Sequence, residues 1–197
     1  MCEAVCVTQS SAVSGDFSAQ LEKIAAAGAD RIILREKQLS EEEYISLAKK
    51  AAQICGKYGV PLWVHTYISA ARALGTKNVH LSFKAFTALD DDVRQAYDIG
   101  VSVHSASEAV TAAKLGAAYV TAGHIFPTDC KKGLPPRGLD YLSEICASAD
   151  IPVYAIGGIT PENAPQVISA GADGVCIMSG LMKAPEPNVI IEKIHSL

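Results

Sequence analysis

Short apolar segments recur along the chain, and each is followed by a stretch that is either helical in its periodicity or rich in loop-forming residues. These segments are four or five residues long and rich in β-branched residues. Buried parallel strands have this appearance, because helices cover both faces of such a sheet and no polar face is left. Eight strands are predicted, at Ala4–Thr8, Arg31–Leu34, Pro61–Val64, Asn78–Leu81, Gly100–Val103, Ala118–Ala122, Pro152–Ile156 and Gly174–Ile177.

Helices are expected between most of these strands. Ser40 and Glu43 match a capping box, which predicts that a long helix begins after Ser40. The predicted helices are Phe17–Ala27, 41 to about 58, a short helix ending at Gly75, Asp90–Tyr97, Ser107–Leu115, Leu139–Ser148, a helix capped by Thr160-Pro161-Glu162 that runs to Ala170, and about Asn188–His195.

The alternation of eight strands with about eight helices predicts a compact (β/α)8 TIM barrel. A Gly-Ala-Asp motif or a near variant precedes three of the strands, at Gly28–Asp30, Gly116–Ala118 and Gly171–Asp173, which supports a repeating unit. No shift in composition marks a second domain, so residues 1–197 are expected to form one domain. A doubly wound open sheet is the main competitor, but an eighth strand with its own helix favours closure.

Composition excludes several classes of function. The formal charge of −4 argues against a general nucleic-acid binder, which is normally basic. No apolar run is long enough to span a bilayer, and the N-terminus lacks the features of a signal peptide, so a cytoplasmic protein without a membrane partner is expected. The six cysteines show no Cys-x-x-Cys pair. Reduced, packed thiols are favoured over disulfides or a zinc site.

One stretch, Tyr119 to Gly138, combines a buried strand with a long polar loop. The loop offers an imidazole (His124), a hydroxyl (Thr128), a carboxylate, a thiol (Cys130) and three permanent cations. Loops at strand ends carry reactive groups on a rigid scaffold. We therefore expect this loop to form part of a site for an anionic small molecule.

The ends of the last two strands predict a phosphate site. Barrel enzymes often hold phosphate after the seventh and eighth strands, and these positions are Gly157-Gly158 and Ser179-Gly180 here. Glycine lets backbone N–H groups approach an anion closely. Ordinary turn glycines are the alternative.

Cations at two places are further candidates for binding an anion. Arg35 and Lys37 follow the second strand and, by alternation, share one side of an extended stretch. A solvated charge run is the alternative for this pair, and also for Lys131 and Lys132 in the central loop.

His124 is the candidate for proton transfer. It follows a strand end and precedes Ile125-Phe126, so apolar surroundings are expected, where an imidazole can shuttle a proton near neutral pH. A structural histidine bonded to backbone is the alternative. His104 is a weaker candidate at another strand end, while His80 and His195 are expected to be structural.

These residues lie in motifs that resemble the thiamine phosphate synthase/TenI family. The resemblance covers nearly the whole chain, in order and at matching intervals. It is carried by Leu34-Arg35-Glu36-Lys37, Ser102-Val-His-Ser105, Gly123-His-Ile-Phe-Pro-Thr-Asp-Cys-Lys-Lys-Gly133, Ile156-Gly-Gly-Ile-Thr160 and Met178-Ser-Gly180. The family implies a small (β/α)8 barrel with a thiazole phosphate at its mouth, and it suggests a homodimer.

Two activities occur in this family. The synthase joins a pyrimidine pyrophosphate to a thiazole phosphate with magnesium, which two aspartates bind. This chain has His65-Thr66 and Ala85 at the matching positions, and a hydroxyl and a methyl cannot replace two carboxylates for Mg²⁺. The synthase also usually has Gly-Pro where this chain has Gly123-His124. The resemblance is thus closer to TenI-like thiazole tautomerases, which isomerise carboxythiazole phosphate without metal.

The tautomerase interpretation assigns a role to each candidate residue, with no metal or cofactor. His124 carries the proton, and Gly157, Gly158, Ser179 and Gly180 hold the phosphate. Arg35 and Lys131 hold the carboxylate or stabilise developing negative charge, with Lys37, Ser102 and Thr128 as further substrate-binding residues. The synthase and a noncatalytic ligand-sensing barrel are the alternatives. Whether Cys130 takes part stays open.

Overall fold

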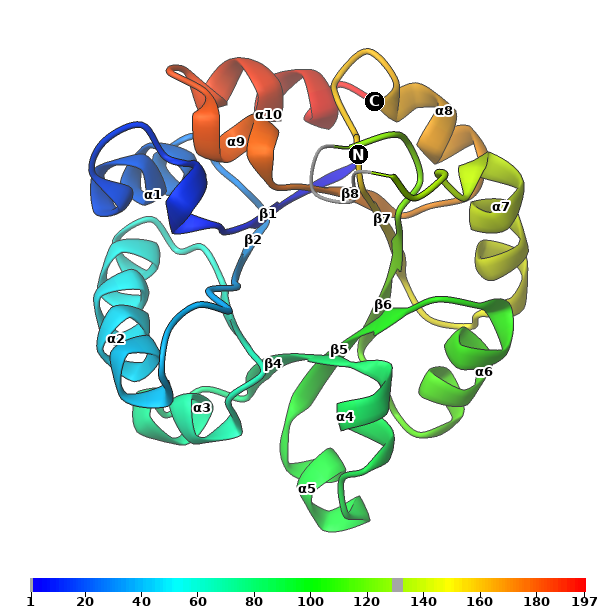
Figure 1. Cartoon of the computed structure of the whole chain (residues 1–197), viewed down its shortest axis with the longest axis horizontal. Coiled ribbons are helices and arrows are strands. Elements are labelled where there is room, and N and C mark those ends of the chain that lie inside the picture. Colours follow the sequence, from blue (N-terminus) through cyan, green and yellow to red (C-terminus); the bar gives the residue numbers. More distant parts are fainter. Residues whose placement is uncertain (1, 129–132) are drawn as a thin grey trace.

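The computed structural model describes residues 2–128 and 133–197. Eight parallel strands close into a barrel in sequence order, and the helices form a ring around it (Figure 1). The predicted (β/α)8 architecture is therefore confirmed. The strands are β1 (Glu3–Val7), β2 (Arg31–Leu34), β3 (Leu62–His65), β4 (Asn78–Ser82), β5 (Asp98–Val103), β6 (Tyr119–Gly123), β7 (Val153–Ile156) and β8 (Gly174–Ile177).

The helices include short ones that the sequence pattern did not predict. The unpredicted elements are α4, α9 and the 3-10 helix η1, which are too short to show helical periodicity. No helix in the described part of the chain is long and apolar enough to cross a membrane. The helices are η1 (Ser10–Ala12), α1 (Phe17–Ala26), α2 (Glu41–Lys57), α3 (Ile68–Leu74), α4 (Phe83–Thr87), α5 (Asp91–Ala96), α6 (Ala106–Lys114), α7 (Gly138–Ser148), α8 (Ala164–Ser169), α9 (Ser179–Lys183) and α10 (Pro187–His195).

Local sequence signals predicted the start of α2 correctly and the start of α8 wrongly. The capping box is confirmed, because the Ser40 side chain accepts from the Glu43 N–H and the Glu43 carboxylate accepts from the Ser40 N–H. The predicted cap of α8 at Thr160–Glu162 is wrong, since this helix begins at Ala164. Asn163 uses its side chain to accept from the Thr160 N–H and to donate to the Gly158 carbonyl, which holds this stretch as a turn.

The repeated Gly-Ala-Asp motif closes the amino end of the barrel. The Asp30 N–H donates to the Ala4 carbonyl, and the Asp30 carboxylate accepts from the Ala4 N–H at 2.7 Å. Asp173 makes the same pair of bonds with Val153, at 2.9 and 2.8 Å. Ala118 keeps only the backbone bond, to Ile99. Each aspartate therefore ties the start of its strand to the neighbouring strand.

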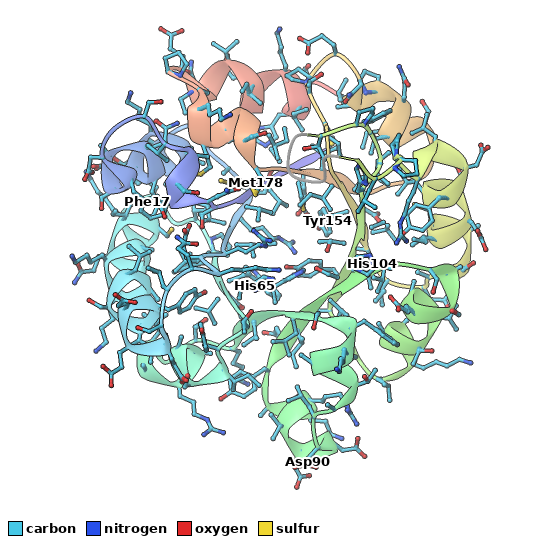
Figure 2. The ribbon with its side chains drawn as sticks, viewed as in Figure 1. Phe17, His65, Asp90, His104, Tyr154 and Met178 are labelled. Atoms are coloured by element: carbon cyan, nitrogen blue, oxygen red, sulfur yellow. The ribbon has the colours of Figure 1, made fainter. Side chains whose placement is uncertain are left out.

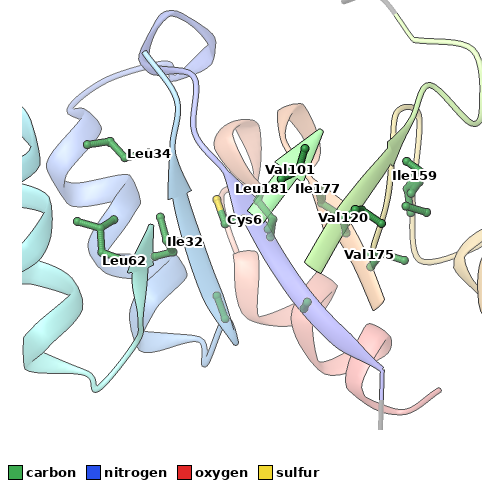
Figure 3. Close-up of a cluster of buried hydrophobic side chains, with 14 of the residues drawn as sticks. Cys6, Ile32, Leu34, Leu62, Val101, Val120, Ile159, Val175, Ile177 and Leu181 are labelled. Carbon is green, nitrogen blue, oxygen red and sulfur yellow. The ribbon is translucent and has the colours of Figure 1, made fainter. Parts of the chain in front are cut away.

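The core has two layers because successive strand residues point to opposite faces. The larger layer lies between the strands and the helices, and Figure 3 shows part of it, including Ile32, Leu34 and Leu62. The smaller layer fills the barrel interior and consists of Val5, Val7, Ile33, Trp63, Tyr119, Tyr154 and Cys176. The described cysteines are free thiols, and Cys130 lies outside the described residues.

Candidate active site

A cavity of about 770 Å³ opens at the carboxyl ends of the strands. Residues at or just after the ends of all eight strands line it. In Figure 2, His65 and Tyr154 lie inside the ring of strands, whereas Phe17 and Asp90 lie outside it. The cavity is therefore the mouth of the barrel, where barrel enzymes carry their active sites.

His124 lies directly after β6 and lines this cavity. The residue is only 4% exposed. Its carbonyl accepts from the Arg137 N–H at 2.9 Å. The next two N–H groups, of Ile125 and Phe126, donate to the carbonyls of Ile156 and Gly157. The backbone around His124 thus continues the pairing of β6 with β7, which holds the imidazole on a rigid support.

The glycine pair after β7 allows this close approach. Gly157 and Gly158 have φ values of 109° and 67°. A Cβ at Gly157 would lie 2.9 Å from the His124 Cα, and one at Gly158 would lie 2.4 Å from the Pro127 carbonyl oxygen. Both glycines are therefore required by the segment that carries His124, whatever ligand binds. A larger residue at either position would displace the imidazole as well as any bound anion.

The expected phosphate residues come together at one side of the cavity. Gly157, Gly158, Ser179 and Gly180 all line it, at the ends of β7 and β8. The carbonyls of Gly157 and Gly158 accept from protein donors, namely the Phe126 N–H and the Asn163 amide. With the carbonyls engaged, the N–H groups of this loop are the polar groups suited to an anion.

The cations expected at the end of β2 also face the cavity. Arg35 and Lys37 both line it, together with Gln38. Thr128 and Ser102 line it as well. Lys131 and Cys130 lie outside the described residues.

His104, the second choice for proton transfer, lines the same cavity from the end of β5. Its side chain is exposed, in contrast to that of His124. Its backbone is held on both sides, since its N–H donates to the Glu108 carboxylate at 2.7 Å and its carbonyl accepts from the Arg137 guanidinium. The more enclosed imidazole, His124, is the better placed of the two for proton transfer away from water.

His65 lines the cavity as well, although it was not predicted as a site residue. It is the last residue of β3, lines the cavity and stacks on His80 with 5.4 Å between ring centroids. Burial, with the charges of Arg35 and Lys37, lowers the pKa of His65 to about 4. A neutral imidazole therefore faces the site at neutral pH. Its position at a strand end was the available signal.

His80 is structural, as expected. Its Nδ1 lies 2.9 Å from the Tyr119 hydroxyl, and its Nε2 lies 2.8 Å from the Ser102 hydroxyl, which accepts from Thr121 at 3.1 Å. Burial and nearby positive charge lower its pKa well below the usual value. This chain of hydrogen bonds forms a polar floor beneath the cavity.

No carboxylate is found among the described residues that line the cavity. Within those residues, no group of three or more His, Cys, Asp or Glu side chains is placed to hold a metal ion. Thr66 directly follows β3 with a φ of 73°, and Ala85 lies on α4 with its side chain exposed. The two positions that matched metal-binding aspartates thus offer a hydroxyl and a methyl.

Comparison with known proteins identifies the family of this chain. A model of the thiamine monophosphate synthase family (TMP-TENI) matches residues 4–181. The chain belongs to this family. A thiamine-phosphate synthase from Clostridium novyi (strain NT) is 35% identical over 185 residues, covering 90% of this chain and 89% of that protein. One from Roseiflexus castenholzii is 39% identical over 165 residues, covering 81% and 72%.

A solved structure of the same family has the same fold. The thiamine phosphate pyrophosphorylase from Pyrococcus furiosus matches with a TM-score of 0.84 and 28% identity, covering 98% of this chain and 94% of that chain. The two sequence relatives are named thiamine-phosphate synthases, and the solved structure is named a thiamine phosphate pyrophosphorylase. The comparisons therefore confirm the expected family of thiamine biosynthesis and favour the synthase alternative over the tautomerase.

Proposed function

We propose that this member of the thiamine monophosphate synthase family is a thiazole tautomerase that works without a metal ion. The observation that carries the proposal is the composition of the cavity wall, which holds cations and imidazoles and, among the described residues, no carboxylate. Magnesium in such sites is bound by one or two carboxylates together with substrate phosphates. Thr66 and Ala85 cannot serve in that role. A site of this composition suits an anionic substrate whose reaction needs only proton transfer.

The proposed substrate, carboxythiazole phosphate, has two anionic ends and a ring that becomes aromatic when one proton leaves and another is added elsewhere. The phosphate lies at the N–H groups of Gly157, Gly158, Ser179 and Gly180. The carboxylate lies at Arg35, with Lys37, Thr128 and Ser102 nearby. Lys131, the other residue expected to hold it, lies outside the described residues. This placement puts the ring between two anchored ends and beside the His124 imidazole.

His124 transfers the proton in this proposal. Its imidazole accepts a proton from the ring and returns one at a second ring atom, so the enzyme ends each cycle in its starting state. Arg35 and Lys37 stabilise the negative charge that develops on the substrate between these steps. His65 also lines the cavity and is neutral at neutral pH, so the positive charge near the substrate comes from Arg35 and Lys37. Aromaticity of the product supplies the driving force.

Thiamine-phosphate synthase is the second candidate, and the names of the relatives favour it. This activity would require the chain to bind magnesium and a pyrimidine pyrophosphate with donors other than the two aspartates. A homodimer is proposed as well, from the family resemblance, and light scattering should then give twice the mass of the 20.7 kDa chain.

One pair of assays separates the candidates. The purified chain is incubated with carboxythiazole phosphate, and separately with thiazole phosphate and the pyrimidine pyrophosphate, each with EDTA and with added magnesium. The proposal expects isomerisation at the same rate under both conditions and no thiamine phosphate. Magnesium-dependent formation of thiamine phosphate would establish the synthase instead. Binding of the thiazole phosphate without any turnover would indicate a ligand-sensing barrel.

A variant sharpens this test. Thr66→Asp combined with Ala85→Asp restores both carboxylates at exposed positions, and aspartate tolerates the left-handed backbone at residue 66 better than threonine does. We expect the double variant to bind magnesium in a calorimetric titration where the parent does not. Equal magnesium binding by the parent would count against the proposed metal independence.

A further inference from the structure

Glu36 is a buried carboxylate just behind the active-site cavity, which it does not line, and the proposed reaction does not use it. Its side chain is 2% exposed, although the residues on either side of it, Arg35 and Lys37, line the cavity. A carboxylate removed from water is costly unless hydrogen-bond donors surround it. The donors around Glu36 therefore indicate what the residue is for.

These donors come from the loops that follow two different strands. From the loop after β1, the Thr8 hydroxyl donates to Oε1 at 2.6 Å and the Ser10 hydroxyl to Oε2 at 2.7 Å. The Ser10 N–H donates to both oxygens, at 3.0 and 2.9 Å. From the loop after β2, the Gln38 amide donates to Oε2 at 2.7 Å. Glu36 thus joins the two loops.

The same bonds fix the segment that carries the two cations. The Thr8 hydroxyl, which donates a hydrogen bond to Glu36, also accepts one from the Arg35 N–H at 3.0 Å. Gln38 also donates to the Ser10 hydroxyl oxygen at 2.9 Å, which ties the far end of the segment to the loop after β1. The segment 35–38 is therefore held at both ends, through the Arg35 N–H and the Gln38 side chain, by contacts that meet at one carboxylate.

We propose that Glu36 is a positioning residue for the anion-binding cations, holding the backbone of residues 35–38 so that Arg35 and Lys37 both face the bound substrate. The identity of the substrate, carboxythiazole phosphate, rests on the proposed function. If Glu36 acted only through its negative charge, substituting it would have the opposite effect on anion binding. Removing a negative charge beside two cations would tighten the binding of an anion, whereas losing their position weakens it.

The chain offers a matched control at the other end of the same strand. Asp30 precedes β2 as Glu36 follows it, and it too ties the β1 end to the β2 end, through the Ala4 N–H. Its carboxylate also contacts His195 Nε2 at 2.7 Å. Asp30 does not line the cavity. A substitution there tests stability without a direct effect on the cations.

The experiment compares Glu36→Gln with Asp30→Asn in steady-state kinetics and thermal unfolding. Glu36→Gln should raise KM for carboxythiazole phosphate by about 10-fold or more, the effect of weakening a hydrogen bond to a charged group. Its kcat should fall by a smaller factor than KM rises, because the two cations hold the substrate's carboxylate in the ground state as well as stabilising the charge that develops during proton transfer. Asp30→Asn should lower the melting temperature and leave KM unchanged. An unchanged or lower KM in Glu36→Gln overturns the proposal, as does an equal rise in Asp30→Asn.

A binding measurement keeps this test separate from the proposed function. Inorganic pyrophosphate is titrated calorimetrically into the parent, Glu36→Gln and Arg35→Met. We expect weaker binding in both variants. Failure of the parent to isomerise carboxythiazole phosphate would refute the proposed function, while this titration would still decide the role of Glu36. Binding by Glu36→Gln as tight as by the parent, or binding by the parent that does not depend on Arg35, would overturn the positioning role. If Glu36→Gln does not fold, Glu36→Asp replaces it with the same expected direction.

Discussion

Two arginines that flank β2, its first residue Arg31 and Arg35 directly after its end, lie at opposite ends of the barrel and have opposite surroundings. At the amino end, Arg31 Nη2 donates to the Glu3 carboxylate at 3.0 Å and to the Tyr154 hydroxyl at 3.1 Å. At the carboxyl end, Arg35 lines the open cavity, and no ion pair reaches it from the part of the chain that the structure describes.

Aromatic rings complete the contrast between the two ends. The guanidinium of Arg31 lies 4.7 Å from the ring centroid of Tyr119 and 4.8 Å from that of Tyr154. Rings at these distances stabilise a cation by cation–π attraction. The charge at the amino end is thus satisfied within the protein and serves stability. The charge at the mouth is available to a ligand, so we expect substitutions at the two ends to separate stability from function.

The largest expected effect is at the mouth, on the rate alone. His124→Asn keeps a polar side chain without a titratable nitrogen. Since a general acid–base group contributes roughly 10²–10⁴-fold, kcat for carboxythiazole phosphate should fall by about two decades or more while the substrate still binds. Rapid-quench or continuous assays at saturating substrate measure this loss. A rate near that of the parent would make His124 structural, and Cys130 or His104 would be the next candidate.

The next effect comes from replacing each arginine by methionine, which keeps most of the side-chain volume. Arg31→Met leaves the Glu3 carboxylate without its cation. This variant should lower the free energy of unfolding by about 2–3 kcal/mol, less than the loss for a fully buried ion pair.

Arg35→Met should change the free energy of unfolding by less than about 0.5 kcal/mol, as most substitutions at a solvated surface do. Its KM should rise by about 10–100-fold, corresponding to roughly 1.5–3 kcal/mol for a lost hydrogen bond to a charged group. Urea unfolding and steady-state kinetics on both variants test this, and a large stability loss in Arg35→Met would break the comparison.

The amino end of the barrel was the more predictable one from the sequence. The Gly-Ala-Asp motif recurs with the strands, and the short apolar segments were correct to within about two residues at each boundary, since burial on both faces leaves a clear pattern. The elements that were not predicted are α4, α9 and η1. They lie in connections at the carboxyl ends of the strands and depend on tertiary contacts. The cap of α8 was misplaced because Asn163 bonds to the Gly158 loop, which local sequence signals do not reveal.

The mouth was predictable only where motifs mark it. Gly157 and Gly158 were selected for an anion, but their lack of a side chain is also required by the approach of the His124 segment, a contact between two loops that are distant in sequence. Glu36 was treated as the residue between two cations. Its role in joining the β1 and β2 loops depends on Thr8 and Ser10, 28 and 26 residues away. Spatial convergence of this kind leaves no periodic signal in the chain.

The smallest expected effect is a pH dependence of stability that originates at the mouth. The pKa of His65 is lowered to about 4 by burial and by the charges of Arg35 and Lys37, whereas an unfolded histidine titrates near 6.5. Between these two values the unfolded state binds the extra proton, so the free energy of unfolding should fall as the pH decreases from about 6.5 to about 4 and should not depend on this group above 6.5. His65→Asn removes the group and should flatten the curve by on the order of 2 kcal/mol across that window.

His80 stacks on His65 and has a pKa shifted in the same direction, so the quantity to compare is the difference in the free energy of unfolding between parent and variant, measured by urea unfolding at each pH. Parallel curves for the two proteins would show that His65 titrates as an exposed residue, and that the carboxyl end of the barrel does not hold a neutral imidazole by burial.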